Sequence, residues 1–160
     1  MPPPSEARQI KLDSQQVEIL GRNKLKAALI EDGIEVATPE RDNGIDLIAY
    51  RWGLSGEFTS RPVQMKAASE FSFGIDAKYH RIPGLILVFV MAVRRDDHAF
   101  YAMTYPELLE MADGLGWTKT PSWNDGGGYS TRHPAKRVME LLKPFEMHRG
   151  GWQRFFAHLA

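Results

Sequence analysis

The chain has 160 residues and no cysteine, and its 20 lysine and arginine residues are balanced by 20 aspartate and glutamate residues. A hydrophobic fraction of 43% in a chain of this length predicts one domain with a buried core. The lack of cysteine excludes disulfide scaffolds, thiolate zinc sites and cysteine nucleophiles, and with a net charge of zero any nucleic acid must bind a local basic surface.

The N-terminal segment is expected to be a flexible arm. Residues 1–12 include a run of prolines, and a single domain is expected over residues 13–160. The longest apolar run, residues 85–93, is well short of the about 20 residues that a membrane helix needs. We therefore expect a cytoplasmic protein with no membrane partner.

The first half of the domain is predicted to be a helix followed by three strands. Apolar residues at helical spacing predict a helix over residues 14–32. Asp13 or Ser14 can cap its N-terminus, and Gly33 suits the left-handed position just past its end. Its inward stripe is expected to comprise Val17, Leu20, Leu25, Ala28 and Leu29. The strands are expected over residues 34–37, 45–50 and 62–67. Glycine and serine in segment 52–60 predict a hairpin between the last two strands.

The rest of the chain is predicted to complete a sheet and to cover it with helices. Residues 85–90 are continuously apolar, which predicts a strand buried on both faces. Another strand over residues 99–103 is followed by a helix that begins at Tyr105. Segment 117–132 is rich in loop-forming residues and is expected to be a long loop. Closing helices are expected over residues 134–142 and 152–159. This order predicts an α/β fold, a mixed β-sheet flanked by helices, in a single domain.

Three polar side chains stand out on the predicted hairpin. Asp46 lies inside an otherwise apolar strand, while Gln64 and Lys66 lie two residues apart on the next strand. Side chains two apart on a strand project from the same face, so the hairpin can gather all three at one edge of the sheet. The Asp46 carboxylate, the Gln64 amide oxygen and the Met65 carbonyl are ligands of the kind that Mg²⁺ prefers. A bound metal would polarise a phosphodiester, and Lys66 would stabilise the charge that develops on the phosphate.

The order of these residues resembles a known nuclease pattern. A helix ends at Gly33, and three segments follow it: Ile34-Glu35-Val36-Ala37, Asp42-Asn43-Gly44-Ile45-Asp46-Leu47-Ile48-Ala49 and Val63-Gln64-Met65-Lys66. This order is similar to that of the PD-(D/E)XK nuclease superfamily, which has a restriction-endonuclease-like fold. The resemblance covers about residues 14–104 and leaves residues 105–160 as a C-terminal helical extension.

The resemblance implies roles for particular residues. The aspartate of the family falls on Asp46 and its lysine on Lys66, while Gln64 stands where most members carry an acid, as in the Q-x-K variant. The glutamate that the family places on its first helix would be Glu18. The implied catalytic residues are Asp46, Gln64, Lys66 and Glu18. The implied ligands of Mg²⁺ or Mn²⁺ are Asp46, Gln64, Met65 and Glu18.

The implied substrate is DNA, and we expect it to be duplex. Ser69, Lys78 and Arg81 follow the third strand and are expected to contact the phosphate backbone. Because each chain carries one predicted active site, cutting both strands of a duplex predicts a homodimer or a higher homo-oligomer.

Three hypotheses follow from the sequence. The first is a metal-dependent DNA endonuclease of a restriction, homing or repair type. The second is a catalytically impaired module of the same fold that binds DNA or a protein partner, because Gln64 carries no charge. The third is an interaction protein in which Asp46 and Lys66 form an ion pair. The nuclease hypothesis requires Asp46 and Lys66 to share one face of the sheet and Glu18 to project toward Asp46.

Overall fold

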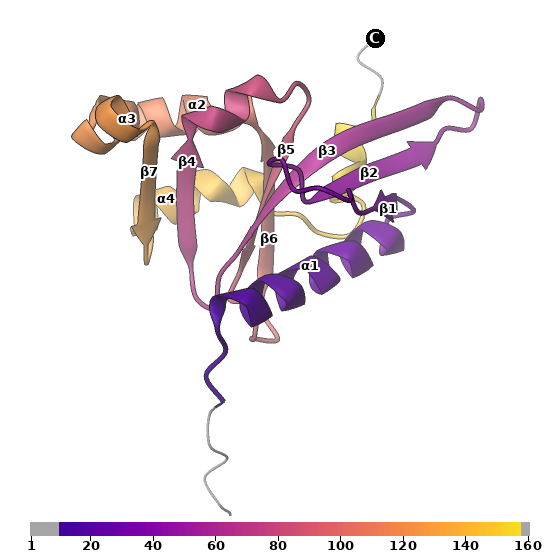
Figure 1. Cartoon of the computed structure of the whole chain (residues 1–160), viewed down its shortest axis with the longest axis horizontal. Coiled ribbons are helices and arrows are strands. Elements are labelled where there is room, and N and C mark those ends of the chain that lie inside the picture. Colours follow the sequence, from indigo (N-terminus) through magenta and orange to yellow (C-terminus); the bar gives the residue numbers. More distant parts are fainter. Residues whose placement is uncertain (1–9, 158–160) are drawn as a thin grey trace, which may run out of the picture.

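The computed structural model describes residues 10–157, which form one α/β domain around a mixed sheet (Figure 1). The sheet has five strands in the order β1-β2-β3-β5-β6, and only β3 and β5 pair in parallel. These strands are β1 (Glu35–Ala37), β2 (Leu47–Trp52), β3 (Phe58–Ala67), β5 (Ile86–Met91) and β6 (Ala99–Thr104). A second sheet pairs β4 (Ser72–Asp76) with β7 (Gly128–Arg132) in antiparallel fashion. The predicted α/β class and the mixed sheet flanked by helices are confirmed.

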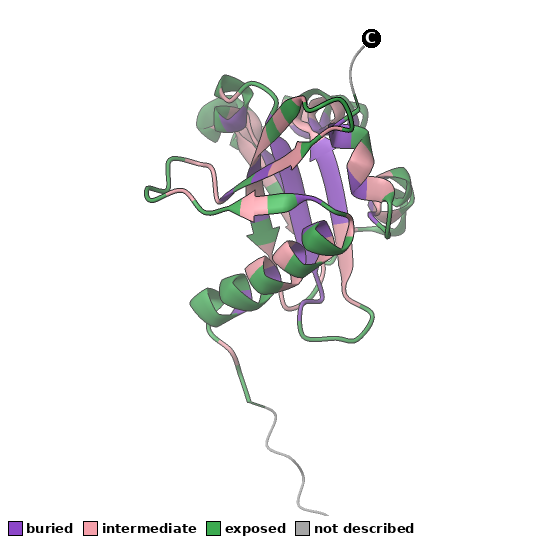
Figure 2. Cartoon of the chain, turned by 90° about the vertical axis from the view of Figure 1, so that its right-hand side faces the viewer, coloured by how far each residue is buried: buried purple, intermediate pink, exposed green. Residues whose placement is uncertain are grey.

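Helical segments cover both faces of the main sheet. The α-helices are α1 (Ser14–Glu31), α2 (Tyr105–Gly114), α3 (Pro121–Gly126) and α4 (Lys136–Leu142). The 3₁₀ helices are η1 (Ala77–Arg81), η2 (Trp117–Lys119), η3 (Lys143–Phe145) and η4 (Gly151–Phe155). One core lies between the sheet and α1 with η4, and the other lies between the sheet and β4, α2 and α4. Figure 2 shows the central strands as buried and the outward faces of the helices as exposed. No helix within residues 10–157 is long and apolar enough to cross a membrane.

Helix α1 begins at Ser14, as the sequence predicts, and ends at Glu31, one residue before the predicted end. The Asp13 side chain accepts a hydrogen bond from the backbone of Gln16, and the Gln16 side chain accepts one from the backbone of Asp13. This reciprocal pair satisfies backbone donors that the first turn leaves free. Gly33 follows the helix with φ of +74°, a conformation that residues with a Cβ rarely adopt.

The buried stripe of α1 differs from the predicted one at Leu20 and at Ala28, which is only partly buried against the core. Leu20 was expected to face inward, but it is 37% exposed, and Gly21 takes the inward place. The buried residues are Val17, Gly21, Leu25 and Leu29, each four residues after the last. A Cβ at position 21 would lie 2.5 Å from the Cβ of Ala67, so the glycine lets the helix approach strand β3 closely.

Gly21→Ala is expected to destabilise the protein by about 1–3 kcal/mol, because the added methyl group overpacks the contact between α1 and β3. Helix propensity alone predicts the opposite sign, since alanine is the better helix former by about 1 kcal/mol. Gly114→Ala is the matched control, because a Cβ at that helical glycine meets nothing within 4 Å. Urea unfolding measures the stability of both variants. A Gly21→Ala protein as stable as the control would contradict the close contact between α1 and β3.

The region from β4 onward departs most from the predicted elements. The predicted long loop over residues 117–132 is wrong, because it contains η2, α3 and strand β7. Strand β4 was not predicted, and it pairs with β7 around Gly74, where a Cβ would lie 2.6 Å from the carbonyl oxygen of Tyr129. The expected C-terminal extension is therefore not wholly helical. Local sequence could not reveal this sheet because its two strands are far apart along the chain.

At both ends of the described chain, the structure differs in detail from the predicted arm and the predicted closing helices. Residues 1–9 of the predicted arm lie outside the described residues, but Leu12 packs against the core and the Ile10 carbonyl accepts a hydrogen bond from Arg94. The helix predicted over residues 134–142 begins at Lys136. The helix predicted over residues 152–159 is the 3₁₀ helix η4, and residues 158–160 lie outside the described part.

Candidate functional site

Asp46 and Gln64 meet where strand β2 begins beside strand β3. The backbone N–H of Asp46 donates to the carbonyl of Val63 at 2.8 Å, which extends the β2–β3 pairing by one residue. Asp46 therefore lies opposite Gln64. The Gln64 Nε2 and the Met65 backbone N–H each donate to Asp46 Oδ2 at 2.7 Å, so two donors fix this carboxylate.

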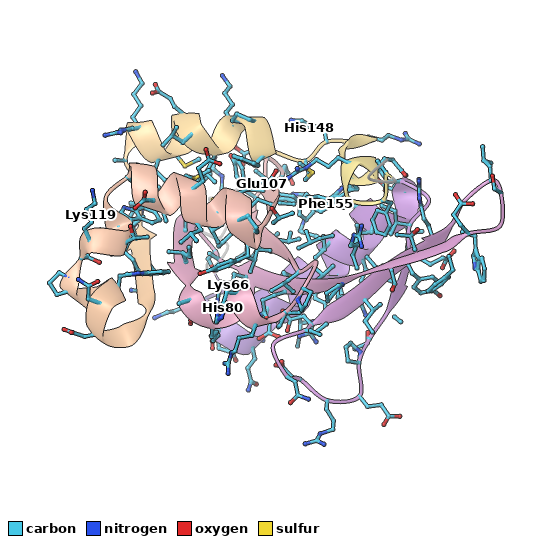
Figure 3. The ribbon with its side chains drawn as sticks, turned by 90° about the horizontal axis from the view of Figure 1, so that it is seen from above. Lys66, His80, Glu107, Lys119, His148 and Phe155 are labelled. Atoms are coloured by element: carbon cyan, nitrogen blue, oxygen red, sulfur yellow. The ribbon has the colours of Figure 1, made fainter. Side chains whose placement is uncertain are left out.

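Lys66 lies on the same face of the sheet as Asp46 and Gln64. Strand alternation places Gln64 and Lys66 on one face, while Val63 and Met65 enter the core on the α1 side. The Lys66 ammonium lies 5.5 Å from the centre of the Tyr79 ring, so Lys66 and η1 are neighbours in the view from above (Figure 3). Among residues 10–157, Lys66 has no carboxylate within ion-pair distance. The Asp46–Lys66 ion pair of the third hypothesis is therefore not formed.

The surroundings of Asp46 favour its protonated form. Partial burial raises the pKa of Asp46 above its ordinary value of 3.8, and the hydrogen bond from the Met65 N–H opposes this shift. The negative charges of Asp42 and Glu18 raise the pKa further, and the positive charge of Arg22 lowers it. A divalent cation would supply the positive charge that this carboxylate lacks.

Glu18 does not contact Asp46. Its side chain is 53% exposed and forms an ion pair with Arg22, four residues later on α1. The Arg22 Nε is buried without an acceptor, the one such side-chain atom among the described residues. Arg22 was not predicted to lie near the site, although its spacing from Glu18 is that of an ion pair along a helix. The structure thus brings Asp46, Gln64, Met65 and Lys66 to one place and leaves Glu18 in a separate pair.

A groove of about 660 Å³ opens beside Gln64. Its walls are the Asp42–Gly44 loop and η1, which contributes Lys78 and Arg81. Lys78 is exposed and pairs with Asp76 at 3.3 Å, while Arg81 is exposed. The two basic side chains predicted to contact phosphate therefore line the groove that leads to the site.

A second cavity of about 390 Å³ lies next to Lys66. Strands β4 and β7 form much of its wall, with Phe89 of β5 and Tyr129 of β7 among the lining residues. Ser69, the third residue predicted to contact DNA, lines neither cavity. No signal in the sequence pointed to the second cavity, because its walls come from the unpredicted sheet.

The donor set near Asp46 fits a hard divalent cation in ligand type but carries little charge. Within residues 10–157, no three histidine, cysteine, aspartate or glutamate side chains are placed to hold a metal ion. Asp46 Oδ1 accepts no hydrogen bond from the described residues, and Gln64 Oε1 faces Gly44 at the groove. The Met65 carbonyl accepts from the Gln64 amide at 3.2 Å. One carboxylate oxygen and one amide oxygen thus remain for a cation.

Comparison with known proteins gives no match to a protein-family model, a curated protein or a solved structure.

The Asp46→Asn protein is expected to become progressively more stable than the natural protein as pH rises. A folded-state pKa above the unfolded value means that Asp46 contributes stability below its ordinary value of 3.8, which is lost as pH rises through the raised pKa. The asparagine Oδ1 can accept the same two hydrogen bonds without a charge. Denaturant unfolding from acidic to neutral pH measures the difference between the two proteins.

The control is Asp97→Asn, because Arg95 holds the pKa of Asp97 below its ordinary value and the stability from that pair is lost as pH falls. The Asp97 variant should therefore show the opposite pH slope. If the free energies of unfolding of Asp46→Asn and the natural protein differ by the same amount at every pH, the pKa of Asp46 is not raised in the folded state.

Proposed function

We propose that this chain is a metal-dependent endonuclease that hydrolyses phosphodiester bonds in DNA at the Asp46–Gln64–Lys66 site. One observation carries the proposal: Asp46 and Gln64 are hydrogen-bonded across adjacent strands, and Lys66 lies on the same face beside them. The groove at this point is lined by Lys78 and Arg81, which suits a polyanionic substrate.

Each residue of the candidate site has a separate role in phosphodiester hydrolysis. Asp46 and Gln64 would hold Mg²⁺ or Mn²⁺ through their side-chain oxygens, while the Met65 carbonyl stays bonded to the Gln64 amide. The bound metal would polarise the phosphate and make water a better nucleophile. Lys66 stabilises the negative charge that develops on the phosphate oxygens. Lys78 and Arg81 hold the flanking phosphates and so orient the bond to be cut. Because only the ionised carboxylate binds metal, activity should rise with pH through the raised pKa of Asp46.

Glu18 has a conditional role in this proposal. Its carboxylate joins the metal ligands only if the ion pair with Arg22 opens. Ser69 has no role in phosphate binding here, because Ser69 lines neither cavity.

A second candidate function is a DNA-binding module of the same fold without catalysis. The orientation of Gln64 favours it, because the amide donates to Asp46 and thereby stabilises the carboxylate without any cation. In this case Lys78 and Arg81 bind phosphate, and Asp46 serves only the local structure.

Incubation of the full chain with supercoiled plasmid DNA separates the two functions. The endonuclease nicks or linearises the plasmid with Mg²⁺ or Mn²⁺ and not with a chelator. Salt-sensitive binding without any cleavage would favour the binding module. Since each chain carries one site, linearisation also predicts a homodimer, which sedimentation of the DNA complex tests.

A further inference from the structure

An exposed aromatic cluster lies on the arm formed by strands β2 and β3. The hairpin extends away from the rest of the sheet (Figure 1). Trp52 and Phe58 are directly paired in the β2–β3 register and are 66% and 53% exposed. Their ring centres are 5.0 Å apart, and the Tyr50 ring lies 5.5 Å from Phe58. We call Tyr50, Trp52 and Phe58 the aromatic cluster.

The opposite face of the arm is anchored to the C-terminal part of the domain. Arg51 donates to the carbonyl of Phe156 at 3.2 Å, and Arg61 donates to the carbonyl of Phe155 at 2.9 Å. These bonds fix the arm against η4. The anchored face therefore turns inward, and the face with the aromatic cluster turns toward solvent.

The aromatic cluster shares its sheet face with the candidate active site. Trp52 lies six residues after Asp46 along the same strand direction, so strand alternation places both on one face. At about 3.3 Å per residue the two are about 20 Å apart. Gln64 and Phe58 share the same face of β3 for the same reason. Exposed rings, the Asp46–Gln64 pair and the groove therefore follow one another along one surface.

The charges at the far end of this surface identify the kind of partner that fits it. Lys66 lies beyond the Asp46–Gln64 pair, and Lys78 and Arg81 line the groove there. Rings at one end and cations at the other match a polyanion whose bases are free to stack. A duplex offers its phosphates but keeps its bases stacked on one another. A second protein chain would satisfy the rings but not the cationic end.

We propose that the aromatic cluster binds a single-stranded segment of DNA next to the bond that is cut, with bases stacked on Trp52 and Phe58. This inference rests on the proposed function and specifies its substrate. The preferred DNA is then a duplex that carries a single-stranded segment, rather than a fully paired duplex. The duplex phosphates occupy the groove at Lys78 and Arg81, and the unpaired bases lie along the arm.

The test measures binding of a fluorescent oligothymidylate to the full chain in the cleavage-impaired Asp46→Asn background. Trp52→Ala and Phe58→Ala remove one ring each, and Trp52→Leu keeps an apolar side chain but removes the stacking surface. Ile30→Ala is the matched control, because Ile30 is 60% exposed on α1, which packs on the other face of the sheet from the aromatic cluster. Sedimentation of each variant reports its oligomeric state.

Trp52→Ala and Trp52→Leu should each weaken oligothymidylate binding by about 5- to 150-fold, the loss expected when one base no longer stacks. Ile30→Ala should bind as the parent does. Equal affinity in all variants, or full affinity in Trp52→Leu, would overturn the inference. So would a parent that binds no oligothymidylate, or a dimer that Trp52→Ala dissociates without any change in DNA affinity.

The two proposals can fail separately. Metal-dependent cleavage of plasmid DNA by a protein that does not bind oligothymidylate overturns the stacking inference and keeps the endonuclease. Ring-dependent binding of oligothymidylate by a protein that never cleaves DNA keeps the stacking surface and removes the endonuclease.

Discussion

Lys66→Ala is expected to lower the rate of Mg²⁺-dependent DNA cleavage by at least about 100-fold, because removal of one group that stabilises transition-state charge has an effect of this size. The fold should be unaffected, since Lys66 is exposed and its ammonium lies over the face of the Tyr79 ring. DNA affinity should change little, because Lys78 and Arg81 remain in the groove. Single-turnover cleavage at saturating protein isolates the chemical step.

Lys136→Ala is the matched control for this prediction. Its side chain is 92% exposed on α4, so the variant loses the same charge at a position outside the candidate site. If Lys66→Ala and Lys136→Ala cleave DNA at the same rate, Lys66 has no role in the chemistry. A lower rate with unchanged denaturant unfolding places the loss in the reaction and not in the fold.

Gln64→Glu is expected to make the folded state depend on a bound cation, because it replaces the hydrogen bond between Gln64 and Asp46 with two facing carboxylates. The Gln64 amide nitrogen lies 2.7 Å from Asp46 Oδ2, and a glutamate there would replace a donor with a second carboxylate. Two carboxylates at this distance cannot both ionise without a proton or a metal between them. Without metal the variant should lose about 1–3 kcal/mol of stability, as expected when a partly buried acceptor loses its donor.

Divalent cations should reverse this loss. At a Mg²⁺ concentration 100 times the dissociation constant, binding to the folded state adds about 2.7 kcal/mol. Thermal unfolding with and without Mg²⁺ should therefore show a much larger metal-dependent shift for Gln64→Glu than for the natural protein. Gln16→Glu adds the same charge at the capping box of α1 and should show no such shift. Equal shifts in all three proteins would mean that Gln64 is not a metal ligand.

Sequence alone could predict the elements that local chemistry determines. The capping pair at Asp13 and the left-handed Gly33 define the ends of α1, and the apolar run that begins near Leu85 defines the central strand β5. Period-two alternation was enough to place Gln64 and Lys66 on one face. The predicted hairpin brought Asp46 near Gln64, and the structure adds the hydrogen bond between them, which was not predicted.

The missed features depend on contacts between distant parts of the chain. Leu20 and Gly21 are adjacent, and only the close approach of α1 to Ala67 decides which of them turns inward. Strands β4 and β7 pair although more than fifty residues separate them in the chain, as in the pair Gly74 and Ser130. No local turn signal therefore marks their pairing in the sequence. Glu18 has the spacing of an ion pair with Arg22, and its distance from Asp46 depends on how the helix packs.

A crystal of the full chain grown with Mn²⁺ tests the central claim most directly. We expect an anomalous difference peak between Asp46 Oδ1 and Gln64 Oε1, on the face of the sheet that carries Lys66. Occupation of this position should disappear in Asp46→Asn, which lacks the only carboxylate that contacts Gln64 in the described part of the chain. Crystals that show no manganese at Asp46, at Mn²⁺ concentrations that saturate carboxylate sites, would contradict a metal-dependent nuclease at this position.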